Sequence, residues 1–332
     1  MSKPNVHILG TGSYAPEKVL NNADLMRMVD TTDDWITTRT GIKERRVAGP
    51  GVATSDLATP AAKAALEAAG LDVLDVDLIL LGTATPDMLF PSTACVVQSN
   101  LGARNAAAFD LSAACSGFLY AVSVGKAFIE SGTYRNALVI GAETLTNILN
   151  WEDRTTCVLF GDGAGAVVLG RADEEDKTGT GIHAIHLHSD GDLTKLLYMP
   201  AGGSRIPTSA DSVEKKLHYV KMEGREVFKH AVKLMSTAME ETLADAGFTP
   251  ADLDLLIPHQ ANLRIMEAVA KRLEIPNEKV FVNVDRYGNT SAASVPIALD
   301  EAVRSGRIKP GDLVGTVVFG GGFTWAAAAV RF

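Results

Sequence analysis

The chain contains an internal repeat, and no other feature constrains its fold as strongly. LEAAGLDVLDVDLIL (residues 66–80) aligns with LADAGFTPADLDLLI (residues 243–257) at a constant offset of 177 residues, from 66 to 243. Both segments have the pattern of a helix end, a glycine stop, a short Asp-rich connection and a buried strand. A repeat of this length predicts a duplicated structural unit.

Two more segment pairs follow in the same order along the chain. FDLSAACSGF, which contains Cys115, aligns with FVNVDRYGNTSAA, which contains Asn289, when small register changes are allowed. LFGDGAGAVVLGR (159–171) aligns with VFGGGFTWAAAAVR (318–331). Three pairs in one order indicate duplication rather than chance.

These pairs predict two copies of one αβ unit, at residues 1–172 and 178–332, joined by a solvated acidic linker at residues 172–181. Each copy combines buried strands with Ala-rich helices, so we expect an α/β fold of layered sheets and helices. Two related halves with one core imply a pseudo-two-fold axis. Cys115 and Asn289 are then expected to face each other across it.

Composition narrows the class of protein. A net charge of −9 argues against nucleic acid as the main partner. No run of 18 uncharged apolar residues occurs, and the N-terminal MSKPNVHILG is too short in apolar length for a signal peptide, so we expect neither a membrane span nor secretion. Three cysteines fit a reducing cytoplasm.

Cys115 is the first candidate for chemistry. It lies between a predicted strand and a predicted helix, where the helix dipole and free N–H groups favour a thiolate nucleophile. The alternative is a small buried residue, the usual environment of a free cysteine. We assign that structural role to Cys95, in a predicted apolar helix, and to Cys157, in a predicted buried strand.

Three further features accompany the cysteine. His259 follows a predicted strand, at the sheet edge where catalytic groups collect in α/β proteins. Asn289 precedes an Ala-rich helix, and the glycines at 320–322 allow a backbone N–H to approach a ligand. The structural alternatives are a core or capping histidine, an Asn N-cap and a tight turn.

Cysteine, histidine, asparagine and a glycine turn together suit acyl transfer. Moving an acyl group from one thioester to a cysteine costs little free energy. An imidazole N–H and an amide NH₂ could hold the carbonyl of a second thioester and stabilise the enolate left when a malonyl group loses CO₂. The set predicts a carbon–carbon condensing acyltransferase.

Nearly the whole chain resembles the 3-oxoacyl-[acyl-carrier-protein] synthase III family. The most specific motifs are TDDWITTRTGIKERR, ACSGFLYA, FGDGAGAVVL, PHQANLRI, YGNTSAAS and FGGGFTWAAAAVRF. The resemblance implies the thiolase fold, with αβαβα halves about a pseudo-two-fold axis, in a homodimer. It also implies that a short acyl-CoA, acetyl-CoA above all, condenses with malonyl-acyl-carrier protein to start fatty-acid synthesis, with no cofactor besides the coenzyme A thioester.

The resemblance also implies catalytic roles. Cys115 would be the acylated nucleophile. His259 and Asn289 would bind the malonyl thioester and stabilise the enolate. Gly321 would supply a second oxyanion N–H beside that of Cys115, and Phe319 would lie near the imidazole.

Substrate contacts are implied in the same way. Trp35 and Arg154 resemble the pair that sandwiches the adenine of coenzyme A, and Arg39 and Asn262 resemble residues of the same tunnel. Phe90 resembles the residue that reaches across the dimer to close the partner's acyl pocket.

An acidic carrier protein needs a local positive patch on this acidic chain. Lys229 and Lys233 share a face of one predicted helix, and Arg264 and Lys271 share a face of the next, with Arg272 adjacent. The resemblance places Lys229, Arg264, Lys271 and Arg272 near the tunnel mouth. Ordinary solvated charges are the alternative.

Two other patterns are not assigned a ligand. GTGSYA (10–15) and GDGAGA (161–166) lack the strand–turn–helix context of a dinucleotide site. In HAIHLH, we expect His186 and His188 to lie on one strand face without carboxylates or cysteines nearby, so no metal is predicted.

Two alternative functions remain. One is a related condensing enzyme of polyketide or quinolone metabolism. The other is a non-condensing partner subunit, against which the joint presence of Cys115, His259 and Asn289 counts.

Overall fold

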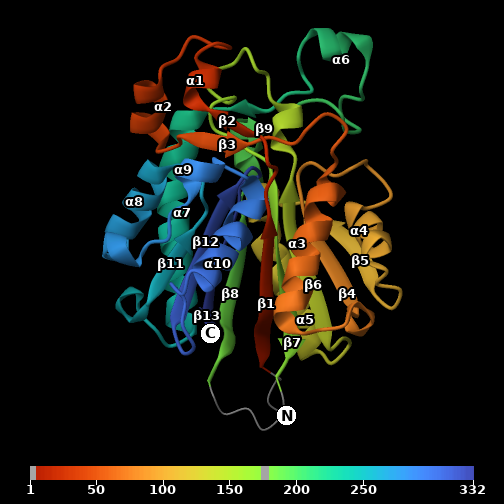
Figure 1. Cartoon of the computed structure of the whole chain (residues 1–332). Helices are drawn as coiled ribbons and strands as arrows, with labels where there is room; N and C mark the ends of the chain where they lie inside the picture. Colours follow the sequence, from red (N-terminus) through yellow and green to blue (C-terminus); the bar gives the residue numbers. More distant parts are fainter. Residues whose placement is uncertain (1–4, 173–178) are drawn as a thin grey trace.

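The computed structural model describes residues 5–172 and 179–332, which form two mixed sheets (Figure 1). The first sheet has the strand order β1 (Val6–Tyr14), β7 (Gly163–Arg171), β6 (Asn136–Glu143), β4 (Leu78–Gly82) and β5 (Ala107–Leu111). The second has the order β8 (Gly181–Ser189), β13 (Thr324–Arg331), β12 (Leu313–Gly320) and β11 (Leu255–Pro258).

Both sheets share one topology. In the first, β1, β7 and β6 are antiparallel neighbours and β6 is parallel to β4. In the second, β8, β13 and β12 are antiparallel neighbours and β12 is parallel to β11. Strand β5 has only an isolated bridge between Leu256 and Val280 as its counterpart. The predicted duplicated α/β fold is therefore confirmed.

Helices complete a five-layer arrangement (Figure 1). Helices α3 (Thr54–Ala69) and α4 (Thr93–Leu101) cover the outer face of the first sheet. Helices α5 (Gly117–Glu130) and α10 (Ser294–Arg304) contribute to the core between the sheets. Helices α7 (Gly224–Asp245) and α8 (Leu263–Arg272) cover the outer face of the second sheet.

Strand alternation explains this layering. In β4, Leu78 and Leu80 pack into the core between the sheets, whereas Ile79 and Leu81 pack under α3. Side chains of a strand point to opposite faces in turn, so a fully apolar strand must be covered on both sides.

Shorter elements gather at the end of the molecule away from both termini (Figure 1). They are β2 (Val19–Asn21), β3 (Glu44–Arg46), α1 (Asn22–Leu25), α2 (Asp33–Thr40), β9 (Leu197–Tyr198), β10 (Lys221–Met222), α6 (Ala210–Glu214) and α9 (Val284–Tyr287). No helix among the described residues combines the length and apolar character needed to cross a membrane.

The predicted boundary between the halves is not tested by the structure. The linker predicted at residues 172–181 falls largely on residues 173–178, which lie outside the described residues. The division at 172 and 178 stays a prediction.

The repeat register near the candidate site differs from our alignment. Ala114 and Ser291 each begin a 3-10 turn, η2 (Ala114–Ser116) and η7 (Ser291–Ala293), and each has a positive φ, 46° and 50°. The 177-residue offset thus pairs Cys115 with Ala292. The predicted equivalence of Cys115 and Asn289 is wrong, because the two segments were aligned from their first residues, Phe109 and Phe281, which are 172 rather than 177 residues apart.

The other two cysteines also differ from expectation. Cys95 lies in α4 as predicted, but it is exposed rather than buried. Cys157 is buried, but it lies in a turn rather than in a strand.

Candidate active site

Cys115 is held in a constrained turn between β5 and α5. The preceding residue, Ala114, has a φ of 46°, a conformation that non-glycine residues seldom adopt. Gly320, at the end of β12, lies so close that a Cβ there would be 2.6 Å from the backbone nitrogen of Cys115. The second sheet therefore presses directly against the turn that carries the sulfur.

Burial raises the pKa of the Cys115 thiol to about 12. The neighbouring Ser291 side chain, whose hydroxyl donates to Glu143, lowers this pKa, and the Glu143 carboxylate raises it. Burial of the charge therefore opposes the thiolate that the position at a helix N-terminus favours.

Glu143 is a site residue that the sequence analysis missed. Its side chain is buried and accepts hydrogen bonds from the hydroxyls of Thr85 at 2.6 Å and Ser291 at 2.9 Å. Burial raises its pKa to about 7. The available signal was a glutamate that directly follows the apolar run ALVIGA (137–142) in strand β6, since a buried carboxylate needs partners.

His259 extends from the carboxyl end of β11, as predicted. Its backbone N–H donates to the Val317 carbonyl at 2.7 Å, and its Nδ1 lies 2.6 Å from the Ser294 hydroxyl. Burial lowers the pKa of the imidazole to about 4, so the ring is neutral near pH 7. Ser294, the first residue of α10, is a second contact that the sequence analysis missed.

Asn289 is fixed by its neighbours rather than acting as an N-cap. Its backbone N–H donates to the Leu159 carbonyl at 2.8 Å, and its Oδ1 accepts the Ser291 N–H at 2.8 Å. Because Oδ1 is engaged, the NH₂ group of the amide points the other way.

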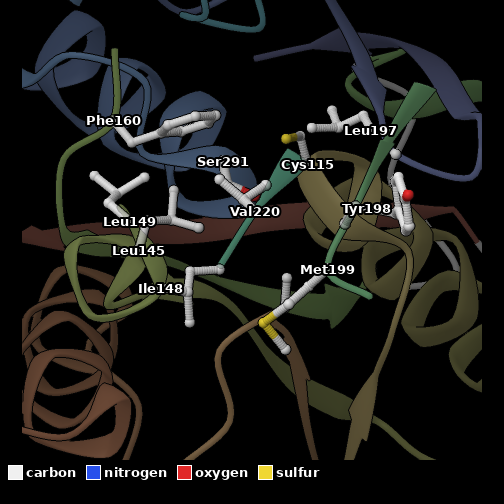
Figure 2. A pocket seen from close by; sticks show the side chains of 13 residues that line it. Cys115, Leu145, Ile148, Leu149, Phe160, Leu197, Tyr198, Met199, Val220 and Ser291 are labelled. Carbon is white, nitrogen blue, oxygen red and sulfur yellow. The ribbon is translucent and has the colours of Figure 1, made fainter. Parts of the chain in front are cut away.

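An apolar cavity of about 170 Å³ opens at the Cys115 sulfur (Figure 2). In Figure 2, Cys115 and Ser291 lie at one end of it, and Ile148 and Met199 lie at the other. Gly321 also contributes to its wall. The remaining lining residues are Ala84, Ala114, Leu145, Leu149, Phe160, Leu197, Tyr198 and Val220.

A second cavity, of about 240 Å³, also reaches Cys115. His259, Asn289 and Phe319 line it together with the sulfur, so the predicted residues come together in one space. The two cavities share Cys115, Phe160 and Leu197, which places the sulfur at their junction.

The outer part of the second cavity contains the predicted tunnel residues. Trp35, Arg39 and Asn262 line it, and the guanidinium carbon of Arg39 lies 4.8 Å from the centre of the Trp35 ring. Arg154 lies 5.3 Å from the same ring centre and donates to the Asp30 carbonyl at 2.7 Å. Asn262 caps α8 and donates to the Arg39 carbonyl at 3.0 Å.

The residues of the predicted positive patch lie at different distances from this opening. Arg264 lies 5.7 Å from the centre of the Phe228 ring, which lines the second cavity. Lys229 is exposed on α7. Lys271 and Arg272 are exposed two turns further along α8, about 11 Å away along the helix axis.

Phe90 lies apart from both cavities. It is 85% exposed, beside Leu89 at 81% and Met88 at 47%. Phe109, on the edge strand β5, is exposed too.

Our expectation that His186 and His188 lack nearby carboxylates is wrong. Glu241 and Asp245 approach them from α7, 3.5 Å from Nε2 of His188 and 3.2 Å from Nε2 of His186 respectively. The sequence could not show this, because the two carboxylates lie more than fifty residues further along the chain than the histidines they approach.

The two stacked sheets are those of the thiolase fold. The site between them combines a buried cysteine, a neutral imidazole and an oriented amide, which is the set of groups of a cysteine-dependent acyltransferase. The comparisons with known proteins specify it further. The model of the 3-oxoacyl-[acyl-carrier-protein (ACP)] synthase III family matches residues 109–191, and that of its C-terminal region matches residues 243–332.

Relatives match over nearly the whole chain. A beta-ketoacyl-[acyl-carrier-protein] synthase III of Caldanaerobacter subterraneus is 62% identical over 98% of this chain and 97% of its own. The crystal structure of 3-oxoacyl-[acyl-carrier-protein] synthase III from Aquifex aeolicus is 51% identical with a TM-score of 0.90, covering 98% of this chain and 100% of its own.

A priming beta-ketosynthase of the R1128 polyketide pathway is 37% identical with a TM-score of 0.91, over 100% of this chain and 97% of its own. The chain belongs to the 3-oxoacyl-[acyl-carrier-protein] synthase III family.

Proposed function

We propose that the chain catalyses the decarboxylative condensation of a short acyl-CoA with malonyl-acyl-carrier protein, through an acyl-Cys115 intermediate, and so starts fatty-acid synthesis. The carrying observation is the position of Cys115 at the junction of two cavities, with His259 and Asn289 in one of them. The relatives' name, beta-ketoacyl-[acyl-carrier-protein] synthase III, supports the carrier-protein substrate.

In the first step, the Cys115 sulfur attacks the acyl-CoA thioester. A carbon–sulfur bond forms, the bond to coenzyme A breaks, and the thiol proton passes to the departing sulfur. The exchange of one thiol for another needs no net base, which suits a thiol with a raised pKa. The backbone N–H groups of Cys115 and Gly321 would receive the oxyanion.

In the second step, the malonyl thioester occupies the cavity that holds His259 and Asn289. Loss of CO₂ leaves its electron pair as an enolate, whose oxygen accepts hydrogen bonds from Nε2–H of His259 and the NH₂ of Asn289. If Ser294 donates to Nδ1, the neutral ring keeps its proton on Nε2. The enolate carbon then takes the acyl group, and the released thiolate takes a proton from water.

Coenzyme A would enter past Trp35. An adenine between Trp35 and Arg154 needs about 7 Å between its neighbours, two contacts of about 3.5 Å. The guanidinium of Arg154 is 5.3 Å from the ring centre, so it must move outward by about 2 Å when the nucleotide binds.

Charged and apolar side chains on the surface support two protein partners, a carrier protein and a second copy of this chain. An acidic carrier protein would dock on Lys229, Arg264, Lys271 and Arg272 of α7 and α8, with Arg264 nearest the second cavity through its contact with Phe228. A homodimer would cover the exposed apolar side chains of Met88, Leu89, Phe90 and Phe109, and Phe90 would close the partner's acyl pocket. We expect no further cofactor and place the reaction in the cytoplasm.

The size of the apolar cavity predicts the primer. At about 170 Å³ it is similar to apolar protein cavities of about 150 Å³ that hold benzene, so it suits acyl groups of up to about six carbons. Incubation with a series of acyl-CoAs and measurement of intact mass should show acetyl to hexanoyl adducts on Cys115. Exclusive loading by lauroyl or aromatic groups would overturn the assignment to primary metabolism.

Polyketide priming is the second candidate function, because a priming beta-ketosynthase superposes on this chain with a TM-score of 0.91. The same acyl series distinguishes the two, since dedicated priming for another pathway would select a different acyl group. A non-condensing subunit is disfavoured, because the sulfur, imidazole and amide line one cavity.

A further inference from the structure

Two histidines lie on one face of the edge strand β8 and line neither of the two cavities at Cys115. His186 and His188 are separated by one residue, so their side chains leave the same face of the strand. Helix α7 packs across this face, against β8 and its neighbour β13. The His188 ring also stacks on Trp325 of β13, with centres 5.5 Å apart and planes 7° from parallel, which fixes its orientation.

Two carboxylates on α7 face these histidines. Glu241 and Asp245 are four residues apart, so they share one side of the helix. Asp245 Oδ2 lies 3.2 Å from His186 Nε2, and Glu241 Oε2 lies 3.5 Å from His188 Nε2. His186, His188 and Glu241 each offer one ligand atom, and these three atoms lie within 4.8 Å of one another.

The hydrogen-bond pattern leaves one ring nitrogen unsatisfied. Nε2 of His188 is shielded from solvent, and no hydrogen-bond partner of acceptable geometry reaches it among the described residues. A buried nitrogen without a partner costs free energy. A cation bound between this nitrogen and the carboxylates would satisfy it.

The spacing fits a tetrahedral metal ion. Zinc–nitrogen and zinc–oxygen bonds of about 2.0–2.2 Å at tetrahedral angles separate neighbouring ligand atoms by roughly 3.3–3.5 Å. The distance from His188 Nε2 to Glu241 Oε2, 3.5 Å, matches this separation, and the ligand atoms of His186, His188 and Glu241 all lie within 4.8 Å of one another, so small side-chain rotations would close the set around an ion. Both histidine side chains are 32% exposed and that of Glu241 is 52% exposed, so rotation of the Glu241 carboxylate would admit an ion to the shielded Nε2 of His188.

We infer that His186, His188 and Glu241 form a binding site for a divalent transition-metal ion, with Zn²⁺ as the best match, Asp245 beside His186 and a water molecule in the fourth position. Two imidazoles favour zinc over magnesium or calcium, which prefer oxygen ligands only. Two carboxylates neutralise the ion's charge. Bound there, the ion would join the edge strand β8 to α7, the helix whose first turns line the second cavity.

Calorimetric titration of the chelator-treated full chain with ZnCl₂ tests the inference. We expect saturable binding of one Zn²⁺ per chain and a rise in melting temperature with Zn²⁺ concentration, because a ligand that binds only the folded state stabilises it. His188→Asn should weaken this binding by about 100-fold or more, since loss of even an outer-shell partner costs about 10- to 100-fold. Magnesium chloride should not compete.

Matched variants distinguish this site from adventitious binding. Glu241→Gln should also weaken binding, and because Glu241 is exposed the chain should still fold. Glu240→Gln, its exposed neighbour, should leave the affinity unchanged. His183→Asn, on the same strand but outside the cluster, should bind Zn²⁺ like the unmodified chain. Unchanged affinity in both His188→Asn and Glu241→Gln, or no saturable binding, would overturn the inference.

Discussion

Burial shifts three ionisable groups around the Cys115 sulfur toward their neutral forms. It raises the pKa of the Cys115 thiol to about 12 and that of Glu143 to about 7, and it lowers the pKa of His259 to about 4. Neutral groups suit an exchange between thioesters, in which the proton moves with the sulfur. They also suit an enolate, because a neutral imidazole N–H donates a hydrogen bond without giving up its proton.

The raised pKa of Glu143 makes stability depend on pH. Between its ordinary value of 4.5 and about 7, the folded chain keeps a proton that the unfolded chain has lost, so stability falls as pH rises through this window. His259 has the opposite effect: its pKa falls from 6.5 to about 4, so its contribution rises with pH between those values. Only a variant separates the two contributions.

Glu143→Gln should remove the contribution of Glu143 alone. From about pH 5 to about pH 8, the unfolding free energy of the unmodified chain should fall relative to the variant by about 2 to 3 kcal/mol. Urea unfolding at both pH values measures this change. Glu240→Gln, at an exposed position of α7, serves as the control and should follow the unmodified chain. An identical pH dependence in Glu143→Gln would contradict the assignment.

At the scale of elements, parallel strand ends and the helices after them assemble the site. Strand β11 pairs in parallel with β12, so His259 and Phe319 emerge at the same edge of the second sheet. Helix α8 begins just beyond His259, and α7 packs beside it. Both helices therefore lie over the second cavity, where their exposed cations can meet an incoming carrier protein.

Charge reversal on these helices should weaken carrier-protein binding. Lys229→Glu or Arg264→Glu should raise KM for malonyl-acyl-carrier protein by about threefold to tenfold, because an attraction becomes a repulsion. Loading of Cys115 from acyl-CoA should not change, and added salt should reduce the effect. Steady-state kinetics at low and high salt measure the KM for malonyl-acyl-carrier protein.

Lys63→Glu is the matched control for this prediction. Lys63 is exposed on α3, on the outer face of the other sheet. If Lys63→Glu raised KM as much as Lys229→Glu, the effect would reflect net charge and not a docking surface.

The sequence predicted elements well where local pattern controls structure. The strand before His259 and the helix capped by Asn262 occur where expected. The register between Cys115 and Asn289 was wrong. The alignment started from Phe109 and Phe281, and the positive φ values that mark Ala114 and Ser291 as equivalent are not visible in a sequence. Contacts between distant elements, such as Glu143 with Ser291, were equally out of reach.

At the scale of the whole molecule, the duplication explains why one cavity receives groups from both sheets. Each copy brings a 3-10 turn and a helix, α5 or α10, into the core between the sheets. The sulfur comes from one copy, and the imidazole and amide come from the other. The repeat made this architecture predictable, whereas the ionisation of the site depends on burial that only the assembled fold creates.

The exposed apolar loop around Phe90 predicts that two copies associate. Phe90→Asp should raise the dimer dissociation constant by about 100-fold or more, since burying a phenylalanine contributes about 1.5–3 kcal/mol and a symmetric dimer contains two. Analytical ultracentrifugation over a concentration series measures it. Leu74→Asp, at another exposed apolar position, should behave like the unmodified chain. Equal dissociation constants for Phe90→Asp and the unmodified chain would remove this loop from the interface.

The most direct test of the central claim follows the acetyl group on Cys115 through a single turnover. The protein is loaded with acetyl-CoA, freed of coenzyme A and mixed with malonyl-acyl-carrier protein, while intact mass reports the adduct. We predict that Cys115→Ala never gains the acetyl group. Asn289→Ala and His259→Ala should gain it but keep it about 100-fold longer than the unmodified chain, because each has lost one enolate donor. Loss of the acetyl group from Asn289→Ala at the unmodified rate, or acetylation of Cys115→Ala, would contradict the account.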